Sequence, residues 1–146
     1  MTADELLSTD PLAIAPALAF FTVAIADGSL DAAEIDRFRK QMEACDECGT
    51  LFGAALERLS ANTETLDAAM DAASEAVLAG GADAAWAAIR EALSGKANDE
   101  AERFVADAVA FARGIAEAAA GLYDTGPQVS EAEAAAVDRV AAALRG

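Results

Sequence analysis

Apolar residues recur along most of the chain at the three- and four-residue spacing of an amphipathic α-helix. Runs of β-branched and aromatic residues, which mark strands, are missing. The predicted buried stripes are Ile35, Phe38, Met42 and Cys45; Phe52, Ala55, Leu56 and Leu59; Leu66, Met70, Ala73 and Val77; Trp86, Ile89 and Leu93; Phe104, Ala108, Phe111, Ile115 and Leu122; and Val137, Val140, Ala141 and Leu144.

One further segment, residues 11–26, is uncharged and mostly apolar on every side. As a helix it would be about 24 Å long, which is shorter than the roughly 30 Å hydrocarbon core of a bilayer. We therefore expect a buried core helix that begins near Asp10 and Pro11 and runs to about Asp27. Pro16 is expected to kink or restart this helix.

Helix ends are predicted from capping residues and glycines. Thr63 is expected to cap one helix, and Ser130 with Glu133 forms a capping box for the last one. Glycines at 28, 49, 80–81 and 95 are expected to end helices. The sequence thus predicts one all-α domain over residues 1–146, a compact bundle of about seven helices with short connections.

The two ends of the chain share a pattern that suggests an internally duplicated helix-turn-helix unit. In each, an apolar helix leads to an aspartate (Asp27, Asp124), and a helix cap with a glutamate three residues later follows (Glu34, Glu133). Any helical hairpin gives part of this pattern.

The charge balance argues against some classes of function and favours others. The net charge is −16, from 26 acidic and 10 basic residues, and there is no histidine. Such a chain repels nucleic-acid phosphates, so basic protein partners or cations are expected instead, although the charge also serves solubility. The lack of histidine argues against an enzyme. The acidic start, residues 1–5, is unlike a secretory signal, so a cytoplasmic location is expected.

The acidic turn Asp27–Glu34 resembles the second half of a calcium-binding loop. Gly28 allows a sharp turn, and Asp31 and Glu34 add carboxylates of the kind that Ca²⁺ and Mg²⁺ prefer. Apolar Val23 and Ile25 stand where that loop has two further acidic residues, so an EF-hand is rejected. Two interpretations stay open: a partial cation site, or only a helix stop followed by a helix cap.

The sequence Ala26-Asp27-Gly28 after an apolar helix, followed by Leu30, Asp31 and Glu34, resembles the signature of the TerB-like tellurite-resistance family. The N-terminal module of membrane-anchored J-domain proteins shares this signature. The resemblance extends from about residue 11 to residue 144. The family's fold is an all-α bundle with a repeated helix-turn-helix, in agreement with the pattern described above.

The resemblance implies a non-enzymatic role in tellurite and stress resistance, with protein partners in membrane-linked complexes. It also implies divalent-cation binding (Ca²⁺, Mg²⁺ or Mn²⁺) near the acidic turns. Carried over residue by residue, the metal ligands would be Asp27, Asp31 and Glu34. Asp124 and Glu133 match less well, because the segment 123–128 departs from the family's Ala-Asp-Gly form.

Cys45 and Cys48 form a Cys-x-x-Cys pair with three interpretations. Cys45 continues the apolar stripe of its helix, which favours core packing. A redox dithiol would favour an enzyme, but the pair lies at a helix C-terminus with acids between, which disfavours thiolate. A zinc site would need further ligands.

Two further alternatives concern the whole chain. It could be a purely structural subunit that docks a basic partner, and it could form a homodimer.

Overall fold

The computed structural model describes a large part of the chain, and every element of regular secondary structure in that part is a helix. The predicted all-α class is therefore confirmed for these residues. The count of about seven helices and the duplicated unit remain predictions, because most of residues 25–50 and all of 121–130 lie outside the description. The described residues are 2–24, Asp36, Lys40, 51–80, 82–120 and 131–145.

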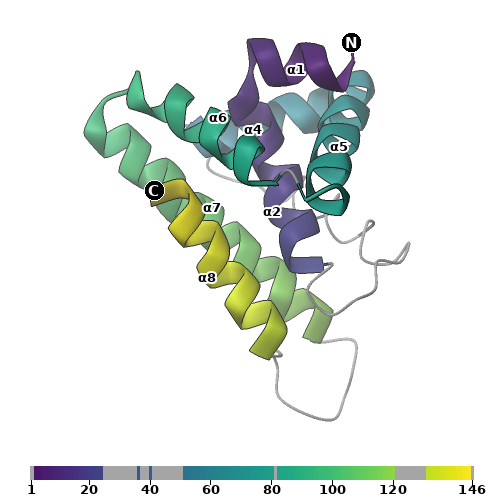
Figure 1. Cartoon of the computed structure of the whole chain (residues 1–146), viewed down its shortest axis with the longest axis vertical. Coiled ribbons are helices and arrows are strands. Elements are labelled where there is room, and N and C mark those ends of the chain that lie inside the picture. Colours follow the sequence, from purple (N-terminus) through teal and green to yellow (C-terminus); the bar gives the residue numbers. More distant parts are fainter. Residues whose placement is uncertain are drawn as a thin grey trace.

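The helices gather around a central one, α2 (Figure 1). Figure 1 shows α7 and α8 running side by side in opposite directions, while α1, α4, α5 and α6 surround the upper end of α2. In chain order the elements are α1 (Ala3–Thr9), the 3-10 helix η1 (Pro11–Ile14), α2 (Ala15–Ala24), α4 (Leu51–Ala61), α5 (Thr63–Leu78), α6 (Ala82–Ser94), α7 (Asn98–Ala120) and α8 (Glu131–Arg145).

Helix α1 was not predicted, because its apolar stripe is too short to show a period. Its start is nevertheless encoded in a capping box formed by Thr2 and Glu5. Thr2 Oγ1 accepts a hydrogen bond from the Glu5 N–H, and the Thr2 N–H donates to Glu5 Oε2, both at 3.2 Å. Leu6, which is fully buried, anchors α1 to the core.

The predicted helix from Pro11 onward is divided in two. Pro11 begins η1, and α2 starts only at Ala15, with Pro16 in its first turn, where a missing N–H costs little. Of the two effects predicted for Pro16, a kink or a restart of the helix, the structure shows the restart. The Asp10 side chain, which precedes Pro11, makes no capping hydrogen bond to η1. Its carboxylate instead accepts a hydrogen bond from Arg58 in α4.

Helix α2 is buried on all sides, as its uncharged sequence predicted. Every residue from Ala15 to Ala24 is buried except Thr22, whose hydroxyl donates to the Leu18 carbonyl oxygen at 2.8 Å. Helices α4, α5, α6, α7 and α8 all contact it. Among the helices described, none combines the length and the apolar character needed to cross a membrane.

The outer helices present their predicted stripes to the same core, with small differences. Phe52 of α4 packs edge-to-face on Phe104 and Phe111 of α7, with ring centroids 5.5 and 5.4 Å apart. In α8 the predicted Ala141 is only half-buried, while Ala136 is fully buried, so the buried face is rotated slightly from the predicted one.

The two ends of helix α5 were predicted from a capping residue and a glycine. The N-cap is Asn62 and not Thr63: Asn62 Oδ1 accepts hydrogen bonds from the N–H groups of Glu64 (2.9 Å) and Thr65 (3.3 Å). Asparagine is at least as good a cap as threonine, so either residue fitted the pattern. At the other end Gly80 has a φ of +77°, the left-handed conformation predicted for a helix stop.

Candidate functional site

The acidic turn predicted as a metal site lies outside the described residues. This holds for Asp27, Asp31, Glu34 and Asp124, and also for Cys45 and Cys48. Glu133 falls within α8, but its side chain is not part of the description. Among the side chains that are described, no three acidic or cysteine residues come together as a metal site would require. The cation site at the acidic turn therefore stays a prediction.

A line of four carboxylates runs along the outer face of α5. Glu64, Asp67, Asp71 and Glu75 are spaced three or four residues apart, and all four are exposed. The buried residues of α5, such as Ala69 and Ala73, lie on the opposite face. None of the four carboxylates forms an ion pair with a described residue, and α5 contains no basic residue. We call this feature the α5 acidic line.

Helix stability accounts only for Glu64, which lies in the first turn of α5, where negative charge complements the helix N-terminus. Like charges three or four residues apart destabilise a helix by about 0.2–0.5 kcal/mol per pair, whereas a lysine at one position would stabilise it by a similar amount. The exposed face of α5 is therefore uniformly negative.

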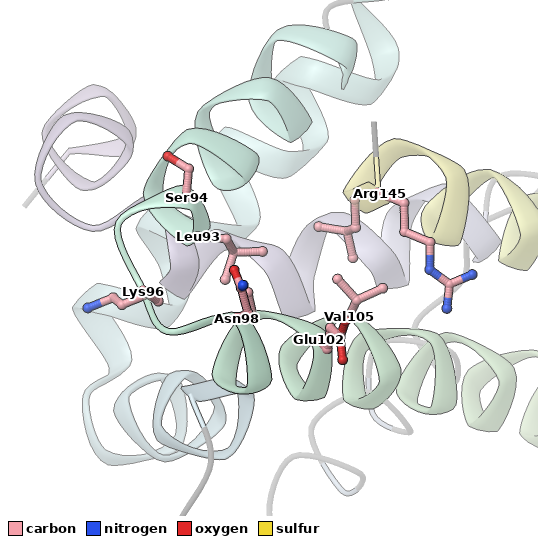
Figure 2. A pocket seen from close by; sticks show the side chains of 9 residues that line it. Leu93, Ser94, Lys96, Asn98, Glu102, Val105 and Arg145 are labelled. Atoms are coloured by element: carbon pink, nitrogen blue, oxygen red, sulfur yellow. The ribbon is translucent and has the colours of Figure 1, made fainter.

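A second surface feature is a pocket where α6, α7 and α8 meet (Figure 2). It has a volume of about 490 Å³. Its floor is apolar, formed by Ala101 and by the more than nine-tenths buried side chains of Leu93, Val105 and Leu144. Figure 2 shows Leu93 and Val105 directed toward the space between the helices. We call it the α6–α8 pocket.

The rim of the α6–α8 pocket is polar and exposed. It carries Ser94, Lys96, Asn98, Glu102 and Arg145. The Ser94 hydroxyl donates to the Glu91 carbonyl oxygen at 2.6 Å, and the Lys96 N–H donates to the Leu93 carbonyl oxygen at 3.0 Å. Both residues therefore hydrogen-bond to carbonyl groups at the C-terminal end of α6. In Figure 2 the Lys96 side chain extends away from the apolar floor.

The ionisable groups that line the pocket are those of Lys96, Glu102 and Arg145. Its lining contains neither a thiol nor an imidazole, and the one hydroxyl, of Ser94, is already hydrogen-bonded to the main chain. Sequence analysis identified Leu93 and Leu144 only as core residues and did not single out the rim. No signal in the sequence joins these residues, because helix packing brings the end of α8 to the turn between α6 and α7.

Comparison with known proteins adds no relative: no family model matches the chain, and no match is found among curated proteins or solved structures. The TerB-like resemblance of the acidic turn therefore remains a prediction.

Proposed function

We propose that this chain is a non-enzymatic, acidic helical module of the TerB-like kind, and that it acts by binding a basic segment of a protein partner. The observation that carries the proposal is the set of exposed carboxylates without an ion pair in the described helices. They lie on the α5 acidic line and at the start of α7, where Asp99, Glu100 and Glu102 are exposed.

The physical basis is the local excess of negative charge. A net charge of −16 produces a potential that attracts cationic segments from a distance and raises their association rate. Each exposed carboxylate contributes little by itself, so binding depends on several of them acting together and weakens as salt is added.

Divalent-cation binding at Asp27, Asp31 and Glu34 is a second part of the proposal. A Ca²⁺-dependent rise in unfolding temperature that Asp27→Ala removes would support it.

A lysine-rich peptide tests the main proposal. Fluorescence anisotropy should show binding at about 0.01 M salt that is largely lost at about 0.15 M, because the Debye length falls from roughly 30 to 8 Å. A glutamate-rich peptide of equal length is the control and should not bind. Equal behaviour of the two peptides would contradict the proposal.

Charge variants show which carboxylates bind. Asp67→Asn with Asp71→Asn neutralises the middle of the α5 acidic line, and Glu100→Gln with Glu102→Gln neutralises the start of α7. The matched control is Asp10→Asn with Asp107→Asn, because those two carboxylates are already paired, with Arg58 and Arg103. At least one of the first two variants should weaken peptide binding more than the control does. If all three behave alike, only net charge matters and no binding face exists.

A further inference from the structure

We draw no further inference here: the strongest candidate, the α6–α8 pocket, has rim charges of both signs, Lys96 and Arg145 against Glu102, over an apolar floor whose three large side chains are already more than nine-tenths buried, so nothing in the structure shows what occupies it.

Discussion

Helices α2 and α5 lie in the same bundle but differ in how much of their surface is buried. Helix α2 has no charged residue and is contacted by five other α-helices and by η1, so nearly all of its surface is core. Helix α5 buries one face against that core and exposes four carboxylates on the other. The difference shows where substitutions should act: on packing in α2, and on helix ends and solvent electrostatics in α5.

The largest effect is expected in α2. Phe20 is fully buried and packs edge-to-face on Phe21, with ring centroids 5.2 Å apart. Phe20→Ala should lower the free energy of unfolding by about 3–5 kcal/mol, because it leaves a cavity that the surrounding helices cannot fill. Urea unfolding measures the loss. Leu78→Ala, at an exposed position of α5, is the control and should change stability by less than about 0.5 kcal/mol.

If Phe20→Ala costs no more than the Leu78 control, then α2 is not the centre of the core. The contrast between the two helices would then be wrong.

A smaller effect is expected at the start of α5. Asn62→Ala removes the side-chain oxygen that accepts from the Glu64 and Thr65 N–H groups, and should cost about 1 kcal/mol. Thr63→Ala should cost much less, because Thr63 lies inside the helix and is exposed. The same urea measurement compares the two variants. A larger loss for Thr63→Ala would restore threonine as the cap.

The smallest effect is expected on the α5 acidic line, and it has the opposite sign. Asp71→Lys replaces two repulsive spacings, to Asp67 and Glu75, by attractive ones. It should stabilise the protein by roughly 0.5–1 kcal/mol at low salt, and less as salt is added. Thermal unfolding at two salt concentrations measures the gain. A loss of stability would show that Asp71 has a structural contact, and a gain independent of salt would show that the helix propensity of lysine, and not charge, accounts for the effect.

Much of this architecture follows from patterns that act over a few residues. The stripes through Phe52, Trp86 and Phe104 predicted α4, α6 and α7, because three- and four-residue spacing brings apolar side chains to one face. The uncharged segment after Pro11 predicted the central helix, since its composition leaves no face for water. Helix α1 was missed although Thr2 and Glu5 form its capping box, because the helix is too short for its periodicity to be visible.

Sequence by itself thus determined most of the described helices, the approximate faces that they bury, and the net charge of the chain. The acidic turn at Asp27, which led to the family resemblance, belongs to this level and remains a prediction. Only the tertiary structure decided the contacts between distant segments, such as that of Arg58 with Asp10 and the meeting of Leu93, Val105 and Leu144 in one pocket. The physical reason is that helix periodicity is local, whereas pairing and pocket formation depend on how helices far apart in the chain pack together.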